Sequence, residues 1–67
     1  MTNNSLSGFD FIELCLDNGC RSIADIATKY SDLFSVSTLE KWHSGNRQPR
    51  LLTKIALYAI AHSEGWV

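Results

Sequence analysis

This chain of 67 residues has little proline, glycine or cysteine: one proline, four glycines and two cysteines. So few turn-forming residues argue against a fold of many short strands and favour a few helices. Cys15 and Cys20 have four residues between them and no second pair to complete a zinc site. We therefore expect Cys15 to be a small core residue, Cys20 to be a loop residue, and no metal to be bound.

Long apolar runs and targeting signals are also missing. No run approaches the ~18 residues of a membrane-spanning helix. Residues 1–7 are polar and lack the charged and apolar regions of a signal peptide. These absences predict a cytoplasmic protein without a membrane partner. The length predicts one domain over residues 1–67 with marginal stability, which oligomerisation commonly raises at this size.

The groups that an enzyme needs are absent as well. The sequence contains no recognisable nucleophile–base pair, carboxylate pair or phosphate-binding loop, and the chain is too short to enclose a pocket around a reaction. His43 and His62 fall in separate predicted helices, without the spacing of metal ligands. We expect no enzymatic activity, no catalytic residue and no cofactor.

Charge is distributed unevenly along the chain. The net charge of −1 is unfavourable for a nucleic-acid binder. Residues 1–40 carry six acids and two bases, a net charge of −4, whereas residues 41–54 carry four bases and no acid, a net charge of +4. Local positive charge matters more than the total for attracting phosphate. Residues 41–54 are therefore a candidate DNA-binding segment, and a solvated charged face is the alternative.

The apolar pattern predicts four helices, over about 8–18, 22–30, 35–44 and 49–62. Ser7 with Asp10, and Ser22 with Asp25, have the form of helix N-caps with reciprocal acids. Asn18-Gly19 ends the first helix, since both residues tolerate the left-handed conformation. The second helix has one apolar stripe over two turns, made of Ile23, Ile26, Ala27 and Tyr30.

The third predicted helix has an inward side with Leu39 and Trp42. Its opposite, solvent-facing side carries Ser37, Glu40, Lys41 and Ser44. It begins near Ser35, although Ser37 with Glu40 forms a second candidate capping box.

The fourth predicted helix has Pro49 in its first turn, where the missing N–H costs nothing. One side, expected to face the core, carries Leu52, Ile55, Ala56, Ala59 and Ile60. A second apolar surface comprises Leu51, Tyr58, Ala61, Trp66 and Val67. We expect this second surface to form a homodimer interface, and ordinary core closure is the alternative.

The segment 22–50 carries the most informative pattern. It contains Ile26-Ala27, Phe34, Ser35, Ser37-Thr38-Leu39, Trp42, Gly45 and Pro49 in sequence. In this pattern the chain resembles the Cro/XRE-type helix-turn-helix family of phage and bacterial repressors. The resemblance implies an all-α fold, a compact lambda repressor-like bundle of four to five helices that contains a helix-turn-helix.

The resemblance also implies a DNA-contacting surface. The N-terminal residues of a recognition helix reach base edges in the major groove, and the following loop contacts phosphate. The residues at these positions are Val36, Ser37, Thr38, Glu40, Lys41, Asn46, Arg47, Gln48 and Arg50. The protein is then expected to be a small phage- or prophage-type transcriptional regulator, binding a double-stranded operator as a homodimer.

The chain departs from the family pattern at several positions. The connection before the recognition helix is about two residues longer than usual, and Ile23 replaces a glutamine that often contacts DNA. Glu40 places negative charge on the predicted DNA face, and His43 replaces the acidic residue that often follows the tryptophan. Glu40 and the missing glutamine, together with the net charge of −1 and the apolar C-terminal surface, suit the alternative hypothesis, a helix-turn-helix-like phage protein that binds and inhibits a host regulatory protein.

Overall fold

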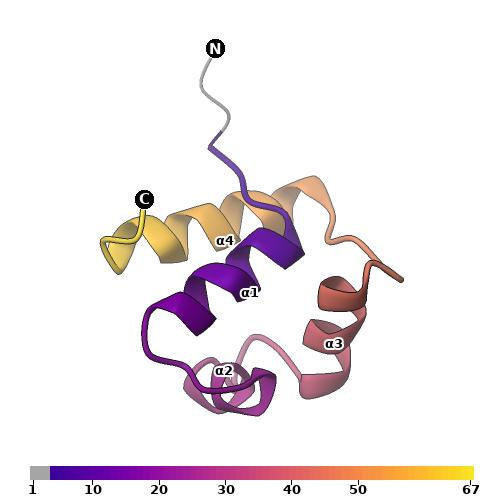
Figure 1. Cartoon of the computed structure of the whole chain (residues 1–67). Coiled ribbons are helices and arrows are strands. Elements are labelled where there is room, and N and C mark those ends of the chain that lie inside the picture. The colour runs from indigo at the N-terminus through magenta and orange to yellow at the C-terminus, as the bar shows by residue number, and fades with distance from the viewer. Residues whose placement is uncertain (1–3) are drawn as a thin grey trace.

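The computed structural model describes residues 4–67, and within this range it contains four α-helices and no strand. The helices are α1 (Gly8–Asp17), α2 (Ile23–Lys29), α3 (Val36–Ser44) and α4 (Leu51–Ser63). α1 packs against each of the other three, α2 also packs against α3, and α4 lies on the side of α1 away from α2 and α3 (Figure 1). The predicted all-helical fold is confirmed, with four helices.

Three helices begin at serine residues, which cap them. The Oγ atom of Ser7 accepts a hydrogen bond from the N–H of Asp10 at 3.0 Å, as predicted for α1. Ser22 accepts from the N–H of Asp25 at 3.2 Å, as predicted for α2. For α3 the cap is Ser35, which accepts from the N–H of Thr38 at 3.2 Å. Each cap satisfies a backbone donor that the first turn of a helix leaves free.

A single apolar core lies between the helices. Its fully buried side chains include Phe11 and Ile12 of α1, Ile26 of α2 and Leu39 of α3. The predicted stripe of α2 is confirmed, because the half-buried residues Ile23, Ala27 and Tyr30 pack against this core beside Ile26. Trp42, only 5% exposed, completes the inward side of α3.

α4 is turned about its axis relative to the sequence prediction. Leu57 and Ala61 are fully buried, and Ile60 is half-buried. Four of the five residues expected to face the core are instead exposed: Leu52, Ile55, Ala56 and Ala59. Their outward position corrects the prediction. Ala61, expected on a dimer surface, belongs to the interior of its own chain.

The cause of this error is that α4 is apolar around most of its circumference, so the helical period alone does not choose a buried side. Contacts with the segments on either side of α4 accompany the observed orientation. The N–H of Leu6 donates to the carbonyl of Lys54 at 3.1 Å, and the side chain of Trp66 packs against the core. Within residues 4–67, neither α4 nor any other helix is long and apolar enough to cross a membrane.

α4 also begins two residues later than predicted. Pro49 is buried and lies before the helix, and Arg50 is the N-cap residue, with extended backbone (φ −72°, ψ 165°) and no side-chain cap. The extended conformation at Arg50 delays the first helical residue to Leu51. Pro49 is therefore a buried residue outside α4 and not part of its first turn.

The two cysteines occupy the predicted environments. Cys15 is a free, buried core residue, and Cys20 is half-buried in the connection after α1. Burial, with a smaller contribution from the neighbouring Cys20, raises the pKa of the Cys15 thiol to about 12. Because folding favours the protonated thiol, the contribution of Cys15 to stability is constant at neutral pH and falls as the pH rises from about 9 towards 12.

We predict that Leu57→Ala lowers the free energy of unfolding by about 2–5 kcal/mol, since it leaves a cavity in the core. Leu52→Ala removes the same atoms from the exposed side of the same helix and changes stability by less than about 0.5 kcal/mol. Urea denaturation followed by circular dichroism measures both. A larger loss for Leu52→Ala than for Leu57→Ala would show that α4 has the opposite orientation.

We predict that a thiol reagent at neutral pH labels Cys20 in the folded protein and leaves Cys15 unlabelled, because Cys15 is buried and reacts only as a thiolate. In denaturant both residues react. Mass spectrometry of the labelled chain counts the adducts, and Cys20→Ser is the control that leaves the folded chain unlabelled. Rapid double labelling of the native protein would contradict the burial of Cys15.

Candidate nucleic-acid interface

α3 is held against the rest of the molecule by one side of its surface. Leu39 is fully buried and Trp42 almost so, and α3 packs against both α1 and α2. Gly45, in the left-handed conformation (φ 84°), ends the helix, and its N–H donates to the carbonyl of Trp42. The opposite side of α3 is therefore available to a ligand along the whole helix.

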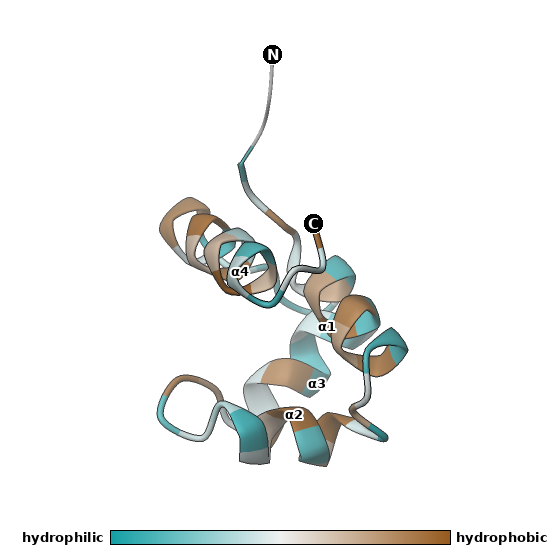
Figure 2. Cartoon of the chain, turned by 90° about the vertical axis from the view of Figure 1, so that its left-hand side faces the viewer, coloured by the Kyte–Doolittle hydropathy of each residue, from teal (hydrophilic) through white to brown (hydrophobic). Residues whose placement is uncertain are grey.

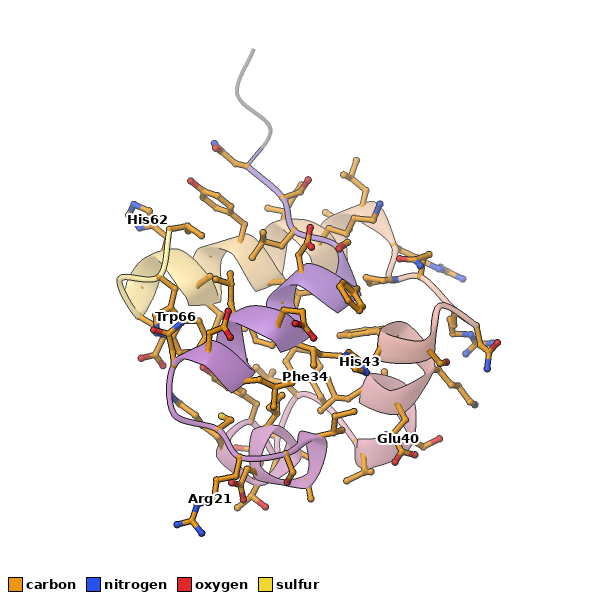
Figure 3. All side chains as sticks on the ribbon, viewed as in Figure 1. Arg21, Phe34, Glu40, His43, His62 and Trp66 are labelled. Atoms are coloured by element: carbon orange, nitrogen blue, oxygen red, sulfur yellow. The ribbon has the colours of Figure 1, made fainter. Side chains whose placement is uncertain are left out.

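An aromatic cluster fixes the connection that precedes α3. The ring of Phe34 makes edge contacts with Trp42, Phe11 and Tyr30, at centroid distances of 5.4, 5.9 and 6.2 Å. The backbone N–H groups of Leu33 and Phe34 both donate to the carbonyl of Tyr30. The connection over 30–35, which the sequence marks as unusually long, is thus closed by its own hydrogen bonds and buried in part through Phe34 (Figure 3).

α1 and α3 are in close contact at Gly8. A Cβ atom built on Gly8 would lie 2.7 Å from both Cβ and Cγ of Trp42, closer than real carbon contacts. Only glycine therefore allows Trp42 to lie at this position. The pattern around Trp42 indicated a core tryptophan, but the dependence on Gly8 was not visible, because the two residues are far apart in the sequence.

His43 is the second link between α3 and α1. Its Nε2 atom lies 3.0 Å from Oε2 of Glu13, and its ring stacks on Phe9 at a centroid distance of 5.1 Å and an interplanar angle of 11°. Figure 3 shows His43 turned towards α1 and Glu40 pointing away from the body of the molecule. His43 therefore positions α3 and does not belong to its outer surface.

The outer surface of α3 contains most of the predicted base-contacting residues. Val36, Ser37, Glu40 and Lys41 are exposed. Ser44 is exposed as well, so the predicted solvent-facing side of Ser37, Glu40, Lys41 and Ser44 is confirmed. Thr38 is half-buried, and its Oγ1 atom accepts a hydrogen bond from Ser35, so it belongs to the cap rather than to the open surface.

The predicted phosphate-contacting residues lie directly after α3. Asn46, Arg47, Gln48 and Arg50 are all exposed, and the N–H of Arg47 donates to the carbonyl of Lys41 at 3.3 Å. This hydrogen bond folds the loop back onto the end of α3. The structure therefore places the loop residues beside the exposed end of the helix.

The charges of this surface are unpaired within the described part of the chain. The ion pairs there are Lys29 with Glu64 and His43 with Glu13, and neither includes Lys41, Arg47 or Arg50. Glu40 has no ion-pair partner there either, so neither Lys41 nor Arg47 neutralises it. Three cations and one carboxylate thus remain to interact with a ligand.

The predicted dimer residues do not form one surface. Leu51 is exposed on α4, Tyr58 is half-buried, and Val67 is exposed near the end of the chain. Ala61 is buried, and Trp66 packs against the core with the ammonium of Lys29 5.2 Å from its ring. Sequence reasoning missed Leu52 and Ile55 as exposed apolar residues, although their spacing on one helix was visible.

The outer surface of α3 consists mainly of hydrogen-bonding groups and exposed charges. Among residues 4–67, no group of three histidine, cysteine or acidic side chains is arranged to hold a metal ion. Comparison of the chain with protein-family models, with curated proteins and with solved structures gave no match.

We predict that Gly8→Ala destabilises the protein by about 1–3 kcal/mol, because the added Cβ overpacks the contact with Trp42. In an unobstructed helix interior the same change stabilises by about 1 kcal/mol, so the sign of the effect is informative. The measurement is the denaturant concentration at the unfolding midpoint, compared between proteins with the same m-value. An unchanged or higher midpoint would show that Trp42 is not in close contact with Gly8.

Proposed function

We propose that this protein is a transcriptional regulator whose α3 enters the major groove of double-stranded DNA, with α2, the connection over 30–35 and α3 acting as a helix-turn-helix. The observation that carries the proposal is the division of α3 into two sides. Leu39 and Trp42 fix one side in the core, while Ser37, Glu40 and Lys41 remain exposed on the other. A helix presented in this way matches the width of the major groove.

The exposed residues of α3 have suitable chemistry for reading bases. Val36 at the helix start suits contact with a thymine methyl group, and Ser37 donates or accepts a hydrogen bond. Lys41 suits the acceptors of guanine, and Glu40 suits the amino group of cytosine. The resemblance of residues 22–50 to the Cro/XRE-type repressors supports the same assignment of roles.

The cations after α3 suit the phosphate backbone. Arg47 and Arg50 are exposed and have no carboxylate partner among the described residues, so binding phosphate breaks no ion pair within this range. With Lys41 they supply three positive charges from one end of α3. Phosphate contacts by Arg47 and Arg50 give a slope of about −1.8 in log K against log salt for each chain, and about −2.7 if Lys41 binds phosphate rather than guanine. The affinity that these phosphate contacts supply is modest, so binding also needs a matching base sequence.

The unpaired carboxylate of Glu40 favours a second candidate function. This carboxylate repels phosphate, whereas it would attract a basic or hydrogen-bonding group of a host regulatory protein. In that case the protein inhibits a regulator instead of occupying an operator. The two functions differ in whether Lys41 and Arg47 contribute to affinity for DNA, and one DNA-binding experiment distinguishes them.

We predict that selection from a random duplex library recovers a specific sequence that the folded protein binds in a fluorescence anisotropy titration. Lys41→Ala and Arg47→Ala each weaken this binding, and where the replaced cation binds phosphate the salt slope becomes smaller by about one unit. Lys29→Ala is the control for the loss of one positive charge, since Lys29 is already paired with Glu64. It removes one positive charge near Trp66, on the side of the molecule opposite α3 (Figure 3), and leaves affinity and slope unchanged.

Failure of the folded protein to prefer any sequence over random DNA would exclude the proposal. Equal losses of affinity for Lys29→Ala and Lys41→Ala would show a general charge effect without an interface on α3. The inhibitor function would be supported if no DNA sequence is selected and if Lys41→Ala and Arg47→Ala still bind a host regulatory protein.

A further inference from the structure

We infer that the outer face of α4 is the surface on which a second copy of this chain packs, with the two α4 helices antiparallel. The outer face of α4 is defined here as its exposed residues Leu51, Leu52, Ile55, Ala56, Ala59, His62 and Ser63. The inference goes beyond DNA binding and is tested without DNA.

This face is strongly apolar although it lies in solvent. Leu52 is 81% exposed, Leu51 63% and Ile55 43%. No aspartate, glutamate, lysine or arginine lies on it, because Lys54, the only such residue in α4, is half-buried on another side of the helix. Figure 2 shows α4 at one edge of the molecule with a largely hydrophobic ribbon. Contiguous exposed apolar surface of this kind marks an interaction site.

The two halves of the face have complementary shapes. The large side chains Leu51 and Leu52 project from its N-terminal half. Its C-terminal half has the small Ala59 and a shallow hollow, lined by Asn4, Ile55, Tyr58, Ala59, His62 and Ser63. A projection and a hollow on one face make that face complementary to a copy of itself, which is the requirement for a two-fold interface.

Antiparallel packing brings the projection and the hollow together. Leu52 and Ala59 are seven residues apart, about 10.5 Å along the helix axis. With the two-fold axis between Ile55 and Ala56, Leu52 of each copy lies over the hollow beside the partner's Ala59. Parallel packing would instead place leucine against leucine and hollow against hollow.

Electrostatics favours the same direction. Antiparallel helices place the positive end of one helix dipole beside the negative end of the other. The net charge of −1 creates little repulsion between the two copies.

The size of the face sets the strength of the dimer. Stable interfaces bury about 800 Å² on each partner. A helix of 13 residues is about 20 Å long and 10–12 Å wide, so its outer face supplies less than this area. We therefore expect a reversible dimer with a Kd between about 1 µM and 1 mM. Because α4 packs against α1 and not against α3, the dimer leaves the outer surface of α3 open.

Sedimentation equilibrium of the wild-type protein is the first test. The average mass is expected to rise with concentration from that of the 7.5 kDa chain towards twice this value. A mass that stays at 7.5 kDa up to about 1 mM would overturn the inference and leave the face to a different protein.

Two charged variants test the surface and the direction. Leu52→Glu and Ala59→Lys are each expected to weaken self-association at least 10-fold, because each places an unpaired charge in the hollow. When the two variants are mixed, antiparallel packing sets the introduced carboxylate opposite the introduced ammonium, so a heterodimer forms more readily than either homodimer. Leu33→Glu is the matched control, since Leu33 is 61% exposed and lies outside α4.

Circular dichroism confirms that each variant is folded, which is expected because the substituted residues are exposed. Unchanged association of Leu52→Glu, or an equal loss of association in Leu33→Glu, would overturn the proposed surface. Weaker association of both α4 variants without recovery in the mixture would overturn the antiparallel arrangement. None of these measurements depends on DNA, so failure of the proposed DNA binding leaves them unaffected.

Discussion

The contact between Trp42 and Gly8 is the constraint on which the arrangement of the helices depends. It brings the indole of α3 onto the start of α1, where any side chain larger than hydrogen would displace it. α1 in turn packs against α2 and α4, so the position of Trp42 relates α3 to the whole molecule. Phe34 adds an edge contact to the same indole and thereby fixes the connection that leads into α3. The ion pair and ring stacking of His43 strengthen this junction from the next residue.

A core built in this way leaves the molecule with two open helix surfaces of opposite character. The outer surface of α3 is polar, and its charges are unpaired within the described residues. The outer face of α4 is largely apolar and carries no aspartate, glutamate, lysine or arginine. Water solvates the first well and the second poorly, so the two surfaces suit different ligands. The proposed functions follow this difference: a charged polymer for α3 and a second copy of the chain for α4.

Local signals predicted the helices and most of the α3 surface because their causes are local. A serine Oγ atom caps a helix by accepting a hydrogen bond from the N–H three residues later, as Ser7 and Ser22 do, so the cap forms within one turn. The alternation of polar and apolar residues in α3 has one clear inward side, so Leu39 and Trp42 were placed correctly. Residues 51–61 lack this alternation, and Leu57 was missed for that reason.

By itself, the sequence determined the number and approximate bounds of the helices, the buried side of α2 and α3, and the exposure of Lys41, Arg47 and Arg50. Only the tertiary structure decided which side of α4 is buried, that Gly8 must accommodate Trp42, and that His43 is bound to Glu13. The physical reason is the range of the interactions. Capping and periodicity act within a few residues, whereas these three features depend on contacts between segments distant in the chain, which exist only after folding.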